Sequence, residues 1–554
     1  MNYLTRHLGR STPQWAPIPG AGQVPNSAGG HAWAVDDWMR LRRFLILGSE
    51  RGSFYSGEWK LTRENADAVA RCIEEDGPRA VAEIVAVSRD GRAPKNDPAI
   101  FALAMASGAK DDRTRRAALD ALPQVCRTGS HLFLFAVLVE GFRGWGRSLR
   151  RAVGRWYTGS EVDALAYQAV KYRSRDGVAH RDLLRLSHPA RAVAGDNPTL
   201  DVSGDHGRLF DWIVRGGDTD GLPRIVEGYA RAQLAETARE SARLIGDYRL
   251  PREAIRSEHL RAPEVWEALL EDMPMTAMIR NLATMTRVGV IASGSAGAGN
   301  VIERLADAER LRKARVHPIA VLAALRTYGA GRGARGRHRW DPVTSIVDAL
   351  DGAFYASFGN VEATGSRTLL ALDVSGSMTW GDVAGVPGLT PRDASAAMAL
   401  VTAATEVHTE TVGFHSGRPG VRFGQRTWAG REDGITPLSI SPRQRLDDAI
   451  ETVSDLPFGG TDCALPMLYA IEREREVDTF VIYTDSETWA GEVHPSQALR
   501  SYRERSGIDA RLVVVGMLSN GFSIADPDDP GMLDVVGFDT GTPAVIAGFA
   551  KGSF

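Results

Sequence analysis

One short motif and the strands around it constrain the fold of this chain more than any other feature. Asp373-Val-Ser-Gly-Ser377 directly follows an apolar run at 368–372, and Asp485 follows a second apolar run at 479–484. A third piece, Gly459-Gly-Thr-Asp462, lies between them. Because open α/β sheets bind ligands at the carboxyl ends of their strands, we expect these side chains to meet at one edge of a parallel sheet.

These pieces supply two carboxylates and three hydroxyls, all of them hard oxygen donors. Mg²⁺ prefers octahedral oxygen coordination and often keeps water or a partner's oxygen in its shell. The set needs no Cys or His, so it is not a zinc-type arrangement. No general base is evident beside the motif, which makes a hydrolytic site the weaker interpretation.

The hydrophobic pattern divides the chain into two parts. From about residue 61 to 350, apolar residues recur at three- and four-residue spacing, as in 61–73, 113–125, 132–141, 222–244 and 316–328. After about 362, strand-like runs (368–372, 411–414, 479–484, 511–517) alternate with helical runs (391–406, 443–453, 463–475, 495–505). The first part predicts helix pairs stacked as a solenoid, although no clean sequence period is present. The second predicts a parallel sheet covered by helices, and residues 1–30 are expected to be irregular.

The charge also divides between the two parts. The net charge is −3 overall, but it is +9 over residues 1–360 and −12 over residues 361–554. The basic charge is nearly all arginine, with 60 Arg and six Lys. Arginine forks suit phosphate and stack on bases. A codon bias toward Arg explains the same composition, so composition alone does not decide for nucleic acid.

Two segments concentrate the basic charge. In Trp145–Tyr157, a helix would bring Arg147, Arg150 and Arg151 together, with Arg155 continuing the row. The second segment, residues 171–188, carries Lys171, Arg173, Arg175, His180, Arg181, Arg185 and His188. Such dense cations are typical of nucleic-acid contacts, and a solvated helix face is the alternative. Leu183, Leu184 and Leu186 are expected to anchor this segment in a core.

Several classes are disfavoured. No apolar run approaches the roughly 20 residues of a membrane span, and the N-terminus has no signal-peptide core. The three cysteines, Cys72, Cys126 and Cys463, are far apart and odd in number. A cytoplasmic protein without disulfides is therefore expected.

The ordered motif Asp-x-Ser-x-Ser, Gly-Gly-Thr, strand-Thr-Asp resembles the metal-ion-dependent adhesion site of von Willebrand factor A domains. The resemblance implies that Asp373, Ser375, Ser377, Thr461 and Asp485 hold Mg²⁺ or another divalent cation directly or through water. It also implies that an acidic group of a protein partner can complete the shell. The alternative is a cation that only steadies the loops.

The whole chain is similar to the Ro autoantigen family of TROVE-domain RNA-binding proteins. The matching stretches include 171–175, 180–188, 272–282, 459–466 and 520–529. The resemblance implies a multidomain fold: an all-α ring of HEAT-like repeats over residues 1–360, and a doubly wound von Willebrand A domain over residues 361–554. The composition is that of a bacterial member.

The resemblance also implies the ligands. Members of this family bind small non-coding Y RNAs on an outer basic face, where Lys171, Arg175 and His188 match key positions. They also take single-stranded ends of misfolded RNAs into the central hole. Bacterial members can work with a 3′→5′ exoribonuclease such as polynucleotide phosphorylase. We therefore predict an RNA quality-control scaffold without catalysis of its own.

Two other classes remain as alternatives. An adhesion module without an RNA role would be expected to carry a secretion signal or disulfides. A subunit of an enzyme complex, like the A-domain subunits of metal chelatases, would be accompanied by a Gly-x-x-x-x-Gly-Lys-Ser/Thr loop, and the sequence contains none.

Overall fold

The fold was analysed in a computed structural model of the chain. It describes residues 11–48, 58–93, 95–189, 204–333, 338–357, 363–381, 383, 389–416, 434–441, 444–454, 456, 459–518, 520–536 and 542–552. At 58–65 only the backbone is described. Within these residues, no helix combines the length and the apolar character needed to cross a membrane.

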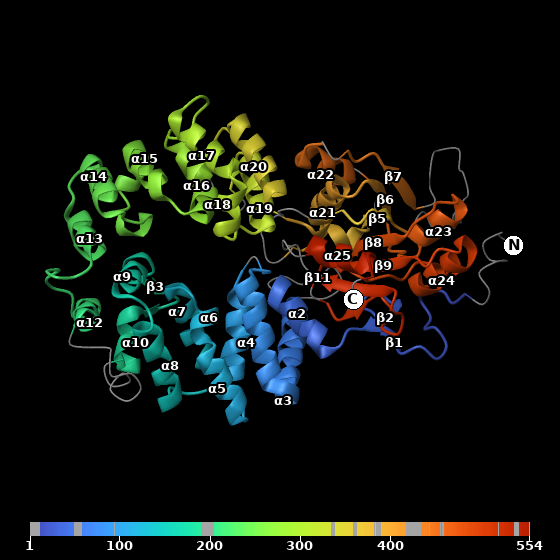
Figure 1. Ribbon diagram of the computed structural model, residues 1–554, viewed down its shortest axis with the longest axis horizontal. Coiled ribbons are helices and arrows are strands. Elements are labelled where there is room, and N and C mark those ends of the chain that lie inside the picture. Colours follow the sequence, from blue (N-terminus) through green and yellow to red (C-terminus); the bar gives the residue numbers. More distant parts are fainter. Residues whose placement is uncertain are drawn as a thin grey trace.

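The first part of the chain is a band of helices, here called the helical band, which runs from α2 to α20 (Figure 1). Its helices are α2 (Asp37–Leu47), α3 (Glu58–Asp90), α4 (Asp97–Ser107), α5 (Asp112–Asp120), α6 (Leu122–Val125), α7 (Gly129–Val139), α8 (Arg147–Thr158), α9 (Val162–Lys171), α10 (His180–Ser187), α12 (Asp205–Arg215), α13 (Arg224–Leu234), α14 (Ala238–Tyr248), α15 (Pro263–Asp272), α16 (Met275–Arg287), α17 (Ala296–Ala306), α18 (Ala308–Lys313), α19 (Pro318–Gly329) and α20 (Thr344–Ala356). Two 3₁₀ turns, η1 (Arg252–Ala254) and η2 (His259–Arg261), and the hairpin β3 (Ser174–Arg175) with β4 (Val178–Ala179) complete it.

Local signals explain many of the helix boundaries. The side chains of Asp111, Thr128, Thr237 and Ser295 accept hydrogen bonds from backbone N–H groups in the first turns of α5, α7, α14 and α17. Such caps satisfy donors that a helix leaves unpaired at its start. The expected helix at 222–244 is in fact two helices, because Ala235 is extended and Thr237 starts α14.

The second part is an α/β domain built on a six-stranded sheet in the order β11-β9-β8-β5-β6-β7. Its strands are β5 (Arg367–Asp373), β6 (His408–Phe414), β7 (Ile435–Leu438), β8 (Thr479–Thr484), β9 (Arg511–Gly516) and β11 (Met532–Val536). The helices are α21 (Pro391–Thr405), α22 (Leu446–Ser454), α23 (Leu465–Glu472), α24 (Pro495–Ser506) and α25 (Thr542–Ala550), with the 3₁₀ turn η3 (Gly376–Thr379).

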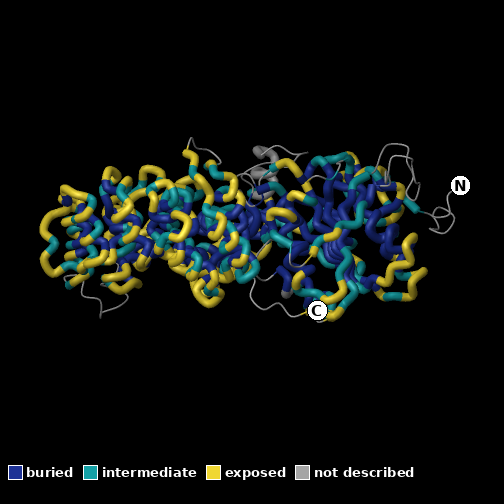
Figure 2. Tube along the Cα trace, turned by 90° about the horizontal axis from the view of Figure 1, so that it is seen from above, coloured by how far each residue is buried: buried dark blue, intermediate teal, exposed yellow. Residues whose placement is uncertain are grey.

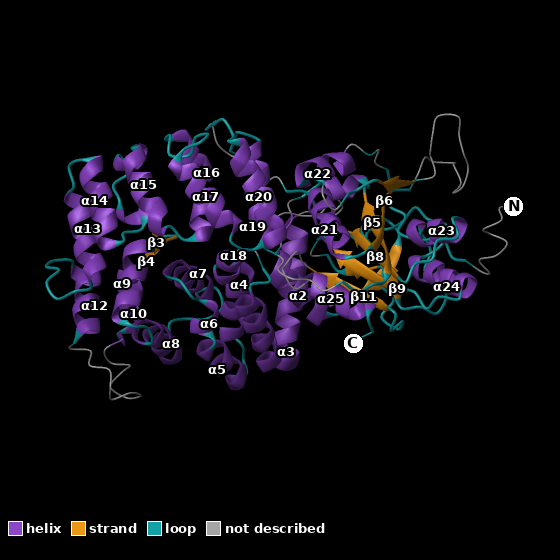
Figure 3. Cartoon of the chain, turned by 45° about the horizontal axis from the view of Figure 1, so that its top comes forward, coloured by secondary structure: helices purple, strands orange, loops and turns teal. Residues whose placement is uncertain are grey.

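The four strands predicted from sequence are present, but the sheet is mixed rather than parallel. β7 runs antiparallel to β6 at one edge, while the other neighbouring pairs are parallel. Helices cover both faces (Figure 3). Alternate residues of the central strands enter two separate cores, Leu370 and Leu372 on the side of α21 and α22, and Leu369 and Ala371 on the side of α23 and α24.

The residues before α2 belong structurally to the α/β domain, which the predicted irregular start of the chain does not anticipate. Strands β1 (Gln23–Pro25) and β2 (His31–Ala34) form a small antiparallel sheet with β10 (Phe522–Ser523). The predicted division at residue 360 falls in a segment outside the described residues, so it stays a prediction.

The helical band contacts the α/β domain at both of its ends. At the first end, Arg43 of α2 forms an ion pair of 2.7 Å with Asp534 of β11. At the last end, Arg445 before α22 forms an ion pair with Asp348 of α20, and the Leu446 backbone N–H donates to Asp351 at 2.9 Å. Figure 2 shows the α/β domain as the most continuously buried part and the band as exposed along both sides. The band therefore closes on the α/β domain.

Candidate nucleic-acid interface and metal centre

Helix α8 presents its arginines to solvent because its apolar residues occupy the opposite face. Leu149, Val153 and Tyr157 are buried, whereas Arg147, Arg150 and Arg151 are exposed. Arg155, expected to continue the row, is held by an ion pair of 2.8 Å with Asp120. All four arginines are thus exposed, as the spacing predicts, and Arg155 is ion-paired.

Helix α10 adds a second row of basic residues. Arg181 and Arg185 are exposed one turn apart, and His188 is exposed at the left-handed residue that ends the helix. Leu183 and Leu184 are buried as expected, but Leu186 is 36% exposed and does not anchor the helix.

Helices α8 and α10 pack against each other, and their contact is polar as well as apolar. The Tyr157 hydroxyl and His180 Nδ1 lie 2.9 Å apart in the buried interface. The exposed cations of these two packed helices are named here the α8–α10 basic surface: Arg147, Arg150, Arg151, Arg181, Arg185 and His188. Both helices lie at the margin of the helical band (Figure 1).

His180 does not lie on this surface. Its side chain is 2% exposed and makes edge-to-face ring contacts with Phe133 and Tyr157. Burial lowers the pKa of His180 to about 4, so the ring is neutral at pH 7. The structure contradicts the expected RNA contact by His180, because a buried, neutral ring reaches no phosphate.

The remaining predicted residues lie beside the surface in a different setting. Lys171 ends α9 and is half-buried, with Nζ 3.1 Å from the Tyr167 hydroxyl. Arg173 is exposed and lies over the ring of Tyr229 at 5.0 Å. Arg175, in the β3–β4 hairpin, pairs with Asp97 at 3.0 Å and with the neighbouring Asp176 at 3.3 Å. Part of the charge of Arg175 is therefore neutralised by these two carboxylates.

The predicted metal ligands come together at the carboxyl end of β5 and β8. Asp373 ends β5, and its Oδ1 accepts a hydrogen bond of 2.9 Å from the Ser375 backbone N–H. Ser375 Oγ and Ser377 Oγ lie 3.0 Å apart. Thr461 is adjacent, since the Gly376 N–H donates to the carbonyl of Gly459. All five predicted ligands are buried.

Two buried oxygens at this centre test whether a cation fits. Thr461 Oγ1 and Asp485 Oδ2 are buried, and neither has a hydrogen-bond partner among the described residues. Burial raises the pKa of Asp485 well above its usual range, and the neighbouring charges of Asp373 and Glu487 add to the shift. Unpaired buried oxygens and crowded carboxylates are costly without a counter-charge. The donor set therefore fits a hard divalent cation.

The N-terminal segment contributes residues that sequence reasoning missed. Glu487 is buried, and its Oε2 accepts a hydrogen bond of 2.9 Å from the Ser27 backbone N–H. Gln14 Nε2 donates to Asp462 Oδ1 at 2.7 Å, and Asn26 Nδ2 donates to the Thr488 carbonyl at 2.7 Å. These contacts join positions more than 440 residues apart, so no local pattern could have predicted them.

A second missed residue connects the helical band with the same loops. Arg43 donates to the backbone carbonyl and to Oδ1 of Asn520, at 2.9 and 3.0 Å. Asn520 Nδ2 in turn donates to the backbone carbonyl of Asp485 at 2.5 Å. The sequence signal was the apolar run Phe44 to Leu47, which directly follows Arg43.

Comparison with known proteins gives a consistent result across the chain. The TROVE domain family model matches residues 24–204 and 249–326, and the Ro60 vWA domain model matches residues 367–550. The RNA-binding protein RO60 of Deinococcus radiodurans is 44% identical over 532 residues, which cover 96% of each chain. The Caenorhabditis elegans RNA-binding protein RO60 is 35% identical, covering 96% of this chain and 90% of the relative.

The fold is similar as well. The crystal structure of the Deinococcus radiodurans Ro protein matches with a TM-score of 0.69 and 43% identity, covering 94% of this chain and all of that one. The expected combination of a helical TROVE region with a von Willebrand A domain is thus confirmed. Since both domains match in order and the similarity extends over nearly all of each chain, this chain belongs to the Ro60 family of RNA-binding proteins.

Proposed function

We propose that this protein binds small structured non-coding RNAs of the Y class through the α8–α10 basic surface. The observation that carries the proposal is that two helices packed against each other together expose five arginines and a histidine. Folded RNA is recognised mainly through its shape, its phosphates and its 2′-hydroxyls. Arginine forks on rigid helices suit that mode of binding.

The second part of the proposal concerns single-stranded ends of misfolded RNAs. The helical band contacts the α/β domain at α2 and again at α20, so it forms a closed band. A closed band can admit a single strand and exclude a duplex by width. In this role the protein is a quality-control scaffold in the cytoplasm that presents RNA to a 3′→5′ exoribonuclease such as polynucleotide phosphorylase. Three buried free cysteines are in line with a reducing compartment.

Charge reversal tests the RNA surface. The triple variant Arg150→Glu, Arg181→Glu and Arg185→Glu should weaken binding of a structured RNA at least about tenfold, because phosphate contacts dominate affinity. The slope of log affinity against log salt should fall by about three. The measurement is fluorescence anisotropy with a labelled hairpin RNA at several salt concentrations.

The matched control reverses three exposed arginines of the α/β domain, Arg473, Arg500 and Arg505, with the same change in net charge. Equal losses in both triple variants would mean that only net charge matters. Unchanged affinity in the first variant would overturn the assignment of the surface.

We also propose that Asp373, Ser375, Ser377, Thr461 and Asp485 bind Mg²⁺, and that an acidic group of a protein partner completes the shell. When bound, the cation would neutralise the buried carboxylates. The variant Asp373→Ala should lose the rise in melting temperature that MgCl2 gives the unaltered protein. A ligand at 100 times its Kd stabilises by about 2.7 kcal/mol.

Two further variants separate metal binding from folding. Thr461→Val removes a buried hydroxyl that has no partner among the described residues, so it should weaken Mg²⁺ binding without lowering stability in EDTA. The exposed Asp509→Ala should respond to MgCl2 like the unaltered protein. Binding of hairpin RNA by Asp373→Ala should stay within about twofold. Loss of RNA binding in a folded Asp373→Ala protein would contradict the separation of the two sites.

A further inference from the structure

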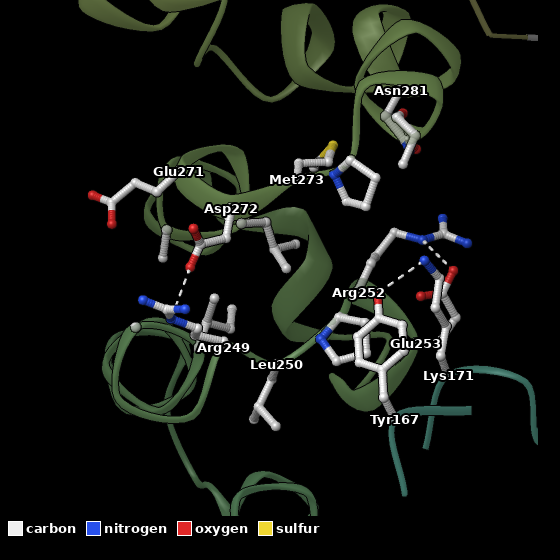
Figure 4. A pocket seen from close by; sticks show the side chains of 17 residues that line it. Tyr167, Lys171, Arg249, Leu250, Arg252, Glu253, Glu271, Asp272, Met273 and Asn281 are labelled. Atoms are coloured by element: carbon white, nitrogen blue, oxygen red, sulfur yellow. Dashed lines mark hydrogen bonds and ion pairs between the residues drawn. The ribbon is translucent and has the colours of Figure 1, made fainter. Parts of the chain in front are cut away.

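A pocket of about 340 Å³ lies between α9, the turn after α14, and helices α15 and α16. Its volume falls in the range of roughly 300–1,000 Å³ that is usual for ligand sites. None of its lining residues belongs to the α8–α10 basic surface or to the metal centre. We call it the α9–α16 pocket (Figure 4).

The floor of the pocket is apolar and its margins are charged. Leu250, Leu269 and Met273 are buried and line it. Figure 4 shows Tyr167, Lys171, Arg252 and Glu253 gathered on one side and the Arg249–Asp272 pair on the other. That pair has an Nε–Oδ2 distance of 3.6 Å and is largely exposed.

The side formed by α9 and η1 presents an aromatic ring, a cation and hydrogen-bonding groups. Lys171 Nζ lies 5.2 Å from the centre of the Tyr167 ring, and Arg252 Nε lies 3.8 Å from Glu253 Oε1. Asn281 of α16 donates to the Ala277 carbonyl at 2.8 Å, and its Oδ1 accepts no hydrogen bond from the described residues. An aromatic ring, an amide acceptor, a carboxylate and two cations therefore line the same pocket.

This combination excludes the simplest ligands. Three cations, Lys171, Arg249 and Arg252, are balanced by three carboxylates, those of Glu253, Glu271 and Asp272, which disfavours a site for a bare anion. A purely apolar ligand would leave these charged margins unpaired. A nucleotide suits both the apolar floor and the charged margins of the pocket. Its base has apolar faces and a polar edge, and its phosphate is anionic.

We propose that the α9–α16 pocket binds one unpaired nucleotide of the RNA, with the base against Tyr167 and the floor, its edge at Asn281 and Glu253, and its phosphate at Lys171 or Arg252. The inference rests on the proposed function, because it assumes that RNA occupies the neighbouring basic residues. Lys171 connects the pocket with the α8–α10 basic surface, since the chain runs from Lys171 through Arg173 and Arg175 directly into α10. Specific RNA recognition commonly uses unpaired bases stacked on aromatic side chains.

The test compares two RNAs that differ only in unpaired nucleotides: a blunt hairpin and the same hairpin with a short single-stranded 3′ tail. Tyr167→Ala should reduce the gain in affinity due to the tail by about tenfold, the scale of one lost base–aromatic stack. Ala277→Phe, which fills the pocket without changing charge, should do the same. The control is Tyr248→Ala, a half-exposed tyrosine on α14 that also has arginines over its ring but does not line the pocket.

The possible outcomes separate this inference from the proposed function. If the pocket variants leave the effect of the tail intact while the arginine triple variant still weakens hairpin binding, the pocket assignment fails alone. If the arginine triple variant has no effect on either RNA, the basic surface fails. Equal weakening of both RNAs by Tyr167→Ala would also overturn the assignment of the tail to the pocket, because a contact with the tail affects only the tailed RNA. Binding of free AMP in calorimetry, without any effect of the pocket variants on the tail, would assign the pocket to a free nucleotide instead.

Discussion

At the scale of single residues, burial separates groups that look alike in the sequence. His180 and His188 stand eight residues apart in the same basic segment, yet the first is 2% exposed and the second is exposed. Arg42 and Arg43 are neighbours, and only Arg43 is buried. Sequence spacing identifies which residues share a helix face. It does not show whether that face is exposed to solvent or packed against another helix.

The burial of His180 makes the stability of the protein dependent on pH. Its pKa is lowered from 6.5 to about 4, so the unfolded chain binds more protons between these values. Stability is complete above pH 6.5 and falls as the pH decreases toward 4, by about 1.4 kcal/mol per pH unit for this one group. His180→Phe should fold with a flatter pH profile over this range, measured as urea midpoints between pH 7 and pH 4.5.

The control for this prediction is His408→Phe, at an exposed position at the start of β6. It should keep the profile of the unaltered protein. His131, whose pKa burial also lowers to about 4, adds a similar slope in all three proteins. If the stability of His180→Phe depends on pH as steeply as that of the unaltered protein, His180 is not the source of this pH dependence.

The metal centre shows which residues the sequence can locate. Asp373 and Asp485 end two neighbouring parallel strands, so sheet geometry alone places them at the same edge. Thr461 could be identified as a candidate ligand from its position in the Gly-Gly-Thr motif. Glu487 could not be predicted in the same way, because its role depends on hydrogen bonds from Ser27 and Ala28, far away in the chain.

At the scale of elements, apolar runs predict central strands well and edge strands poorly. The predicted strand at 479–484 agrees with β8, whose residues are all buried. The edge strand β7 was missed because it has only four residues and contains Pro437. The opposite edge strand, β11, contains Asp534, which reads as a loop residue until its pairing with Arg43 is known.

The long helix α3 is interrupted, and one glycine beside the break is closely packed. Asp76 is not helical, and its Oδ1 accepts a hydrogen bond of 3.1 Å from the Arg79 N–H, which restarts the helix. A Cβ added at Gly77 would lie 1.9 Å from Thr114 Oγ1 and 2.7 Å from Thr114 Cβ. Residue 77 is therefore restricted to glycine by the approach of α5.

We expect Gly77→Ala to lower the stability of the helical band by about 1–3 kcal/mol, the usual cost of overpacking a filled core. The matched control is Gly246→Ala in α14, where no atom lies within 4 Å of the added methyl group. That change should be neutral or stabilising by up to about 1 kcal/mol, because alanine is the better helix former. Thermal unfolding followed by circular dichroism distinguishes the two, and similar melting temperatures would refute the packing argument.

At the scale of the whole molecule, a buried ion pair joins the first helix of the band to the α/β domain. Arg43 is 1% exposed and donates both to Asp534, at two distances of 2.7 Å, and to backbone carbonyls of the α/β domain. Removing one partner of such a pair leaves a buried charge without compensation, at a cost of about 3–5 kcal/mol. Arg43→Met should therefore loosen the contact between α2 and the α/β domain.

The neighbouring arginine supplies the control. Arg42 pairs with Glu83 at 2.8 Å, but its side chain is 43% exposed, so Arg42→Met should cost about 0–1 kcal/mol. Hydrogen exchange of peptides covering β2, β10 and β11 should accelerate in Arg43→Met and remain unchanged in Arg42→Met. Equal protection in both variants would show that closure does not depend on this pair.

Because β2 pairs with β10, the small three-stranded sheet can be completed only late in protein synthesis. Strand β2 can pair with β1 early, but its other edge has no partner until Phe522 and Ser523 have left the ribosome. Every helix of the band emerges before that moment, and the contacts of Arg315 and His317 with the backbone of Arg89 and Arg92 can form within the band alone. Contacts between such distant positions form slowly, because a very long loop must close first. The pairing of β2 with β10 and the ion pair of Arg43 with Asp534 therefore form only after translation of the α/β domain is nearly complete.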